Sequence, residues 1–169
     1  AGSVGARDEN LGVAPDVGLI GLNVFPSDSN LGARNSDIYN ALDWVLDNHE
    51  EYNIVAVNMS LGGGFFSSES QLDGDPTRDI INRLEGEGIT VVSAGGNSYK
   101  ATESQNFGAP AILGTLAVGA VWQDGANSGI TWGSGATDFT TGADRVTSFT
   151  QRWVADNTIF APGALINST

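Results

Sequence analysis

The sequence contains no cysteine, one methionine and one histidine among its 169 residues. Without cysteine, the chain has no disulfide, no thiolate nucleophile and no cysteine-based metal site. Lysine and arginine number 7 against 20 aspartate and glutamate residues, which gives a formal net charge of −13. Because such a chain cannot neutralise nucleic-acid phosphates and is repelled by an anionic membrane surface, neither is expected as a partner. No apolar run approaches the roughly 20 residues that a transmembrane helix requires.

Glycine and apolar residues, by contrast, are plentiful. Glycine accounts for 23 residues, which is roughly twice its usual share of about 7%. Hydrophobic residues make up 40% of the chain, enough to bury a sizeable core and to exclude charge-driven disorder. The length fits a single domain over residues 1–169.

Four short apolar runs, bounded by proline, glycine or polar residues, predict β-strands. They cover residues 17–25, 54–59, 89–94 and 115–121. Their continuous apolar character is typical of strands in a parallel sheet, which is covered on both faces. From Trp122 to Thr150 small polar residues dominate, so we expect surface loops and short antiparallel strands there.

The first predicted helix begins at Asn35 or Ser36, which are both favourable N-cap residues, and runs to about Asp47. Its apolar face repeats at helical spacing through Ile38, Ala41, Leu42 and Val45.

The second predicted helix has Asp75 as its N-cap and Pro76 at its first position, and ends at Gly86 or Gly88. Its buried face consists of Ile80, Ile81 and Leu84. Strands separated by helices indicate right-handed βαβ units. The sequence therefore predicts an α/β fold, a parallel sheet with helices on both faces.

Glycine-rich segments follow two of the predicted strands. Residues 58–64 read NMSLGGG and residues 94–97 read AGGN. Ligands of open parallel sheets bind at the carboxyl ends of the strands, and glycine lets a ligand approach the backbone closely. The residues leave open whether these are tight turns or the two sides of one binding crevice. A nucleotide phosphate site is disfavoured, because no lysine follows either cluster and GxGxxG is absent.

The same residues carry a family resemblance. The runs GVAPDVGLIGLNVF, VNMSLGGG, ITVVSAGGN, LAVGAV and IFAPG occur in this order over nearly the whole chain. Together they resemble the subtilisin-like serine proteases, or subtilases. The resemblance implies a serine endopeptidase that cleaves polypeptides through an acyl-enzyme, secreted from the cell and monomeric.

The resemblance also assigns roles to individual residues. Asn97 matches the side-chain donor of the oxyanion hole, and an amide NH₂ is able to donate to the oxygen that becomes negative when a peptide carbonyl is attacked. The positions that match substrate-binding segments are Ser60, Leu61 and Gly62 on one side, Ala94, Gly95 and Gly96 opposite, and Gly32 at a further edge.

The catalytic Asp, His and Ser of the family are not found in this sequence. Ala1 and Gly2 match the last two residues of the HGTHVAG motif, and the GTSMAxP motif of the serine would follow IFAPG. His49 lies among acidic residues at the polar end of a predicted helix, where a solvated surface role is expected. The resemblance thus implies an internal fragment of a catalytic domain, with a sheet incomplete at both ends. We expect such a fragment to be inactive by itself.

No cofactor is implied with certainty, and no metal site is predicted in this chain. The acidic segment with Asp124, Asp138 and Asp144 lacks the DxDxDG spacing of a calcium loop. The region of Asp8, Glu9 and Asn10 matches a calcium loop of the family but is short. Structural calcium in the intact enzyme remains an expectation.

Two other classes of function stay open. A non-catalytic relative, a pseudoprotease, would bind peptides by strand addition along residues 60–62; substituted triad positions in the flanking coding sequence would favour it. A free-standing flavodoxin-like domain would fold alone and bind a cofactor, which a thermal-shift measurement would detect.

Overall fold

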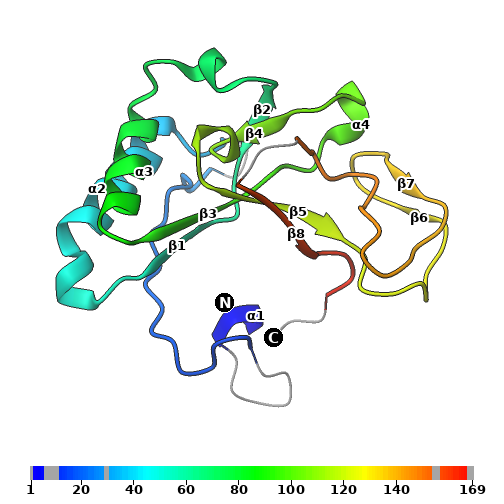
Figure 1. Cartoon of the computed structure of the whole chain (residues 1–169), viewed down its shortest axis with the longest axis horizontal. Coiled ribbons are helices and arrows are strands. Elements are labelled where there is room, and N and C mark those ends of the chain that lie inside the picture. Colours follow the sequence, from blue (N-terminus) through cyan, green and yellow to red (C-terminus); the bar gives the residue numbers. More distant parts are fainter. Residues whose placement is uncertain (1, 6–11, 29–30, 154–156, 167–169) are drawn as a thin grey trace.

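The structure, a computed structural model, describes residues 2–5, 12–28, 31–153 and 157–166. A central sheet lies between two long helices at one end of the molecule and a loop-rich region at the other (Figure 1). The helices are α1 Gly2–Gly5, α2 Asn35–Tyr52, α3 Pro76–Gly86 and α4 Tyr99–Thr102, with 3₁₀ turns η1 Glu69–Leu72 and η2 Ala111–Leu113. The strands are β1 Ala56–Met59, β2 Gly63–Phe66, β3 Thr90–Ala94, β4 Phe107–Ala109, β5 Leu116–Val121, β6 Ile130–Thr131, β7 Thr137–Asp138 and β8 Thr158–Pro162.

The main sheet has the strand order β1-β3-β5-β8, and every pair in it is parallel. Strands β1, β3 and β5 are the predicted strands at 54–59, 89–94 and 115–121, each slightly shortened. The predicted α/β class with a parallel sheet and flanking helices is therefore confirmed. Strand β8, which contains the letters IFAP, is paired with β5 from Ala117↔Thr158 to Val121↔Pro162 and was not predicted as a strand.

The strand predicted at residues 17–25 is wrong. This segment has no strand conformation, and no described strand pairs with it. Its side chains are largely exposed, with Leu19 at 57% and Phe25 at 51% of their full accessibility. An apolar run has the composition of a buried strand, but it forms one only where a neighbouring strand supplies hydrogen bonds.

The first helix, α2, starts and ends elsewhere than predicted. Its N-cap is Arg34, whose carbonyl accepts the backbone N–H groups of Asp37 and Ile38. The Arg34 side chain makes no capping hydrogen bond. Neither Asn35 nor Ser36 caps it. The helix continues past Asp47 to Tyr52 and ends at Asn53, which adopts the left-handed conformation that asparagine tolerates.

Helix α3 follows its predicted pattern closely. The Asp75 carboxylate accepts the N–H of Thr77 at 2.9 Å, and Pro76 occupies the first helical position. Ile80, Ile81 and Leu84 are almost completely buried. All these signals are local in sequence, so they operate whatever the rest of the chain does.

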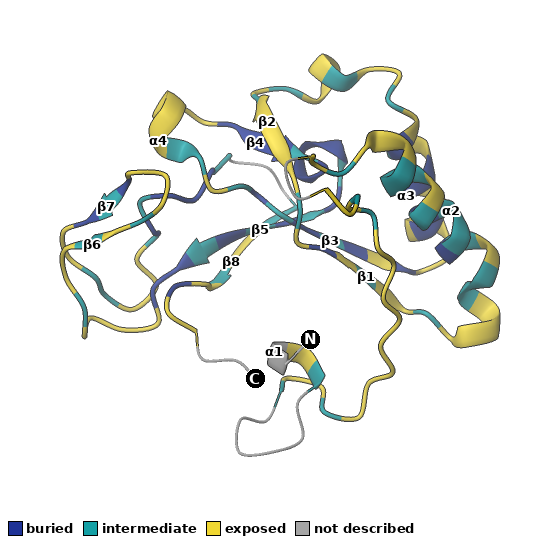
Figure 2. Cartoon of the chain, turned by 180° about the vertical axis from the view of Figure 1, so that it is seen from behind, coloured by how far each residue is buried: buried dark blue, intermediate teal, exposed yellow. Residues whose placement is uncertain are grey.

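The core lies where α2 and α3 pack beside β1 and β3 (Figure 2). Its buried residues are Leu42, Val45, Met59, Ile80, Ile81, Leu84, Ile89, Val91, Phe107, Ala111, Ile112, Leu113 and Ala117. Strand β1 is more exposed than predicted, with Val55 just before it 63% accessible. It forms one edge of the described sheet, so one side has no partner strand.

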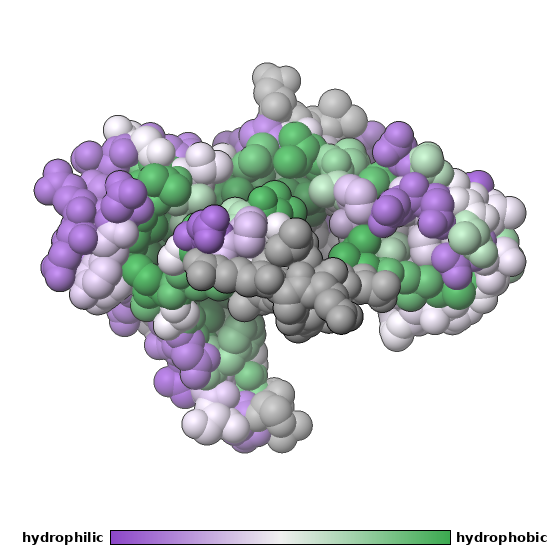
Figure 3. Space-filling model, turned by 90° about the horizontal axis from the view of Figure 1, so that it is seen from below, coloured by the Kyte–Doolittle hydropathy of each residue, from purple (hydrophilic) through white to green (hydrophobic). Residues whose placement is uncertain are grey.

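Large apolar side chains remain exposed outside the core. They include Leu19 and Ile20 in the 17–25 segment and Ile159 and Phe160 on β8. The view from below shows apolar patches at several places on that face, around the grey atoms at its centre (Figure 3). Apolar side chains on this face are thus partly exposed among the residues that the structure describes.

The region after β5 forms loops and the short antiparallel pair β6–β7, as predicted. Three of its aromatic residues pack together: Trp122 is buried and its ring centre lies 5.8 Å from that of Trp132, whose ring centre lies 4.6 Å from that of Phe149. None of the described helices combines the length and the apolar character that a membrane crossing demands.

Candidate active site

Two glycine-rich segments leave the main sheet side by side. The Ser60 segment (residues 58–64) follows β1, and the Asn97 segment (residues 94–97) follows β3. Strands β1 and β3 are parallel neighbours with Met59 opposite Ser93, so both segments emerge at the same edge of the sheet. The structure thus places the two predicted segments at one edge of the sheet, because neighbouring parallel strands end at the same edge.

Strand β4 connects the two segments. Gly63 of the Ser60 segment pairs with Ala109, while the Gly108 N–H donates to the carbonyl of Gly95 at 3.0 Å. Gly62 comes so close to β4 that a Cβ atom would lie 2.6 Å from the Ala109 carbonyl oxygen. Any larger residue at position 62 would therefore push the Ser60 segment away from β4.

Gln151 is a second connection and is buried, with 3% of its surface accessible. Its amide nitrogen donates to the Gly64 carbonyl at 3.1 Å and to Asn106 Oδ1 at 2.8 Å. Its backbone N–H donates to the Gly96 carbonyl at 2.8 Å, and its Oε1 accepts the N–H of Ser98 at 3.4 Å. Gln151 thus connects the two segments, with its side chain bound to the Ser60 segment and its backbone N–H to the Asn97 segment.

Gly96 makes room for this glutamine. Its φ of +115° is rarely adopted by other residues, and a Cβ atom there would lie 2.1 Å from Gln151 Oε1. The glycine before Asn97 is therefore needed both for the backbone turn and for the Gln151 hydrogen bonds.

Asn97 itself is exposed, and its side-chain amide has no hydrogen-bond partner among the described residues. An amide in this state is available to a ligand at the edge of the sheet. Ser60 is exposed as well, and its hydroxyl exchanges hydrogen bonds with the Asn58 amide. Leu61 packs on the core, which anchors the middle of the Ser60 segment.

The remaining predicted site residues behave differently from one another. Ala94 and Gly96 are half-buried and Gly95 is buried. Ala94 pairs with Val118 of β5, and the Gly95 carbonyl accepts the N–H of Gly108 on β4. Gly32 is exposed before α2, and in the described part of the chain no hydrogen bond joins it to the Ser60 or Asn97 segment. The proposed place of Gly32 in the binding site therefore stays a prediction.

His49 lies on α2, away from both segments. Its side chain is 19% accessible, with Nδ1 2.7 Å from the Leu46 carbonyl and Nε2 3.9 Å from Glu87. It is thus tied to its own helix and more enclosed than a solvated surface residue.

The acidic residues of the loop region do not converge on one point. Asp138 is buried and its carboxylate accepts from Trp132 Nε1 at 2.6 Å and from the Ser148 backbone at 3.0 Å. Among the described residues no three His, Cys, Asp or Glu side chains form a group that could hold a metal ion. Asp8, Glu9 and Asn10 lie outside the described residues.

Sequence reasoning missed Gln151, Asn106 and β4. Gln151 and Asn106 stand in unremarkable polar stretches, and nothing local reveals that they meet across 45 residues of chain. The small residues Gly108 and Ala109 beside Pro110 were the one available signal of a close backbone approach.

A family model described as "Subtilase family" matches residues 1–169. The chain belongs to the subtilase family. Among curated relatives, subtilisin DY from Bacillus licheniformis is 33% identical over 125 residues, which cover 72% of this chain and 41% of that protein. An extracellular serine proteinase from a Thermus species is 36% identical over 100 residues, covering 59% and 21% respectively.

Solved structures agree on the subtilase fold. The PatG macrocyclase in complex with peptide has a TM-score of 0.67 at 20% identity, with 99% of this chain and 42% of that chain covered. This subtilase chain therefore spans less than half the length of each of these three relatives.

Proposed function

We propose that this chain is part of a serine endopeptidase, in which it supplies the polypeptide-binding segments and one oxyanion donor. In the whole enzyme a serine would attack the peptide carbonyl with a histidine as general base. Asn97 would donate its side-chain N–H to the oxygen that becomes negative, and an acyl-enzyme would then be hydrolysed by water. The Ser60 and Asn97 segments would hold the substrate backbone between them.

The observation that carries this proposal is the free amide of Asn97 beside the Ser60 segment, both at the carboxyl edge of β1 and β3. Membership of the subtilase family supports the serine chemistry. In this proposal the triad comes from residues outside this sequence, and the contact of the one histidine with the Leu46 carbonyl on α2 supports that assignment. Polypeptide substrates are supported by the peptide complex of the structural neighbour PatG macrocyclase.

Replacement of Asn97 by alanine in the whole enzyme tests the oxyanion role. We expect kcat to fall about 10²–10³-fold, a loss known from a subtilisin, with KM nearly unchanged. The measurement is steady-state hydrolysis of a peptide anilide. The matched control is Asn82→Ala on the exposed side of α3, which should retain activity. Equal kcat in Asn97→Ala and the original would overturn the role.

We further propose that the enzyme is secreted and acts as a monomer. A relative named as extracellular supports secretion. Structural calcium is proposed only for the intact enzyme. A whole protein that binds peptides through these segments but cleaves none would instead support the pseudoprotease reading.

A further inference from the structure

A cavity of about 460 Å³ lies next to the Asn97 segment, between α4 and the loops around β7. Its size falls within the range of ligand-binding pockets, roughly 300–1,000 Å³. Tyr99, which lines it, follows Asn97 by two residues, so the two Cα atoms are at most about 7 Å apart. Asn97 does not itself line the cavity, but the wall formed by Tyr99 begins two residues after it.

The lining of the cavity is unusually rich in cations for this protein. Lys100, Arg145 and Arg152 all line it, which is three of the 7 basic residues of a chain with net charge −13. The lining also contains two acids, Glu103 and Asp138. The Asp138 carboxylate is occupied by Trp132 Nε1 and by the N–H and hydroxyl of Ser148, so it does not pair with the cations.

Two of the three cations are held in place by neutral groups. The Arg152 guanidinium lies 3.7 Å from the centre of the Tyr99 ring and donates to the carbonyls of Thr147 and Thr150. Lys100 donates to the Gly135 carbonyl. Neither contact neutralises the charge, so both remain attractive to an anion.

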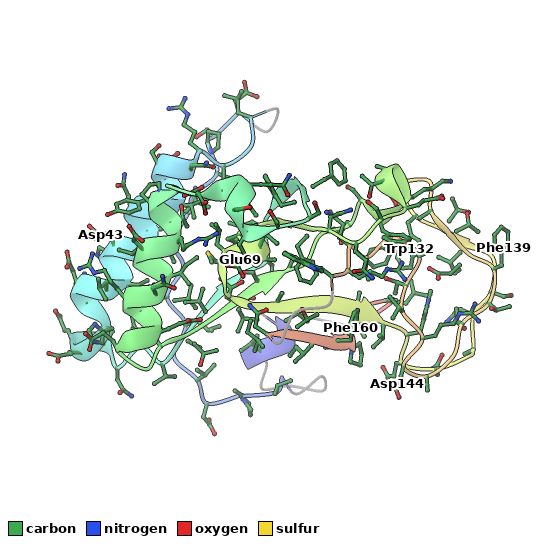
Figure 4. The ribbon with its side chains drawn as sticks, turned by 45° about the horizontal axis from the view of Figure 1, so that its top comes forward. Asp43, Glu69, Trp132, Phe139, Asp144 and Phe160 are labelled. Atoms are coloured by element: carbon green, nitrogen blue, oxygen red, sulfur yellow. The ribbon has the colours of Figure 1, made fainter. Side chains whose placement is uncertain are left out.

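Arg145 is the cation available for direct contact. It is exposed, and in the described part of the chain its guanidinium has neither an ion-pair nor a hydrogen-bond partner. Phe139, on the rim, is 79% accessible. Figure 4 places Phe139 at the far end of the molecule from Asp43. An unpaired arginine beside an exposed aromatic ring suits a carboxylate that carries an apolar neighbour.

We propose that this cavity binds a carboxylate of a polypeptide, with Arg145 as its principal contact and Phe139 packing on an adjacent apolar residue. The role of this cavity in substrate binding rests on the proposed function. A peptide held at Asn97 would present a nearby acidic residue to the cavity. The enzyme would then prefer substrates with aspartate or glutamate a few positions from the scissile bond, next to an apolar residue.

The test is an NMR titration of the ¹⁵N-labelled 169-residue chain with blocked peptides that contain Phe-Glu or Phe-Gln. We expect the Phe-Glu peptide to bind about 10-fold more tightly, the effect of one charge-assisted hydrogen bond in a partly open site. A third peptide, Phe-Gln with a free C-terminus, distinguishes a side-chain carboxylate from a terminal one. The general repulsion of anions by a chain of charge −13 makes binding at other sites weak.

Arg145→Gln should remove the preference for the Phe-Glu peptide, and Arg145→Lys should keep part of it. The control Arg83→Gln makes the same charge change on α3, outside the cavity, and should keep the full preference. Equal binding of the Phe-Glu and Phe-Gln peptides, a preference that survives Arg145→Gln, or no binding by any peptide would each overturn the inference. None of these results depends on kcat, so the oxyanion role of Asn97 stands or falls separately.

Discussion

The Gln151 amide reaches three other segments of the chain through hydrogen bonds to Gly64, Asn106 and Ser98. All lie at the edge of the sheet where Asn97 emerges. If the proposed function holds, Gln151 would align the substrate-binding segments without touching substrate. The proposed roles of Asn97 and Arg145 are direct contacts, whereas that of Gln151 is positioning.

Replacement of Gln151 by leucine keeps a side chain of similar length but removes all its polar atoms. The Gly64 carbonyl and Asn106 Oδ1 then lose their partner, and we expect the free energy of unfolding to fall by about 2–3 kcal/mol. Urea denaturation followed by circular dichroism measures the change. Gln123→Leu, on the exposed surface, should shift the same quantity by less than about 0.5 kcal/mol. Equal changes in the free energy of unfolding for the two substitutions would show that the buried hydrogen bonds of Gln151 do not stabilise the fold.

At the scale of secondary-structure elements, the start of α3 is determined by local signals. Asp75 caps the helix and Pro76 occupies its first position, whereas Ile80, Ile81 and Leu84 are buried because the rest of the core packs on them. The segment at residues 17–25 is the opposite case, because its apolar pattern forms a strand only where a partner strand supplies hydrogen bonds. In this chain, an element can be predicted from the sequence where the interactions that stabilise it are local.

Removal of the α3 cap should have a measurable cost. Asp75→Ala leaves the Thr77 N–H without its acceptor and is expected to lower the free energy of unfolding by about 1 kcal/mol. Asp75→Asn keeps an acceptor oxygen and should restore most of the loss. Thermal unfolding of the three proteins measures both effects, and a destabilisation of the same size in both variants would contradict the capping role.

The limits of sequence reasoning at the site follow from the same principle. Glycine clusters after two predicted strands are local signals that left open whether the segments are turns or two sides of one crevice. The parallel pairing of β1 and β3 is what places the Ser60 and Asn97 segments at the same edge of the sheet. Gln151 and β4 are non-local, since each acquires its role only when distant segments meet. The loop at Gly32 was matched from the resemblance, and no contact in the described residues joins it to the others.

At the scale of the whole molecule, the proposed function assigns binding segments to this chain and the reactive triad to residues outside this sequence. Its one histidine is fixed on α2 by the Leu46 carbonyl. We expect the 169-residue chain by itself to hydrolyse no casein, whereas the whole enzyme in the same assay should. Hydrolysis by the isolated chain that a serine-directed inhibitor abolishes would refute this prediction.

The position of β1 at the edge of the described sheet has a practical consequence. Unpaired N–H and C=O groups along that edge invite a strand from another molecule, and thinly covered apolar side chains nearby would reinforce such an encounter. Mutual repulsion between molecules of charge −13 opposes it. Salt weakens that repulsion, so stock solutions of the chain should be kept dilute and at low ionic strength to avoid precipitation.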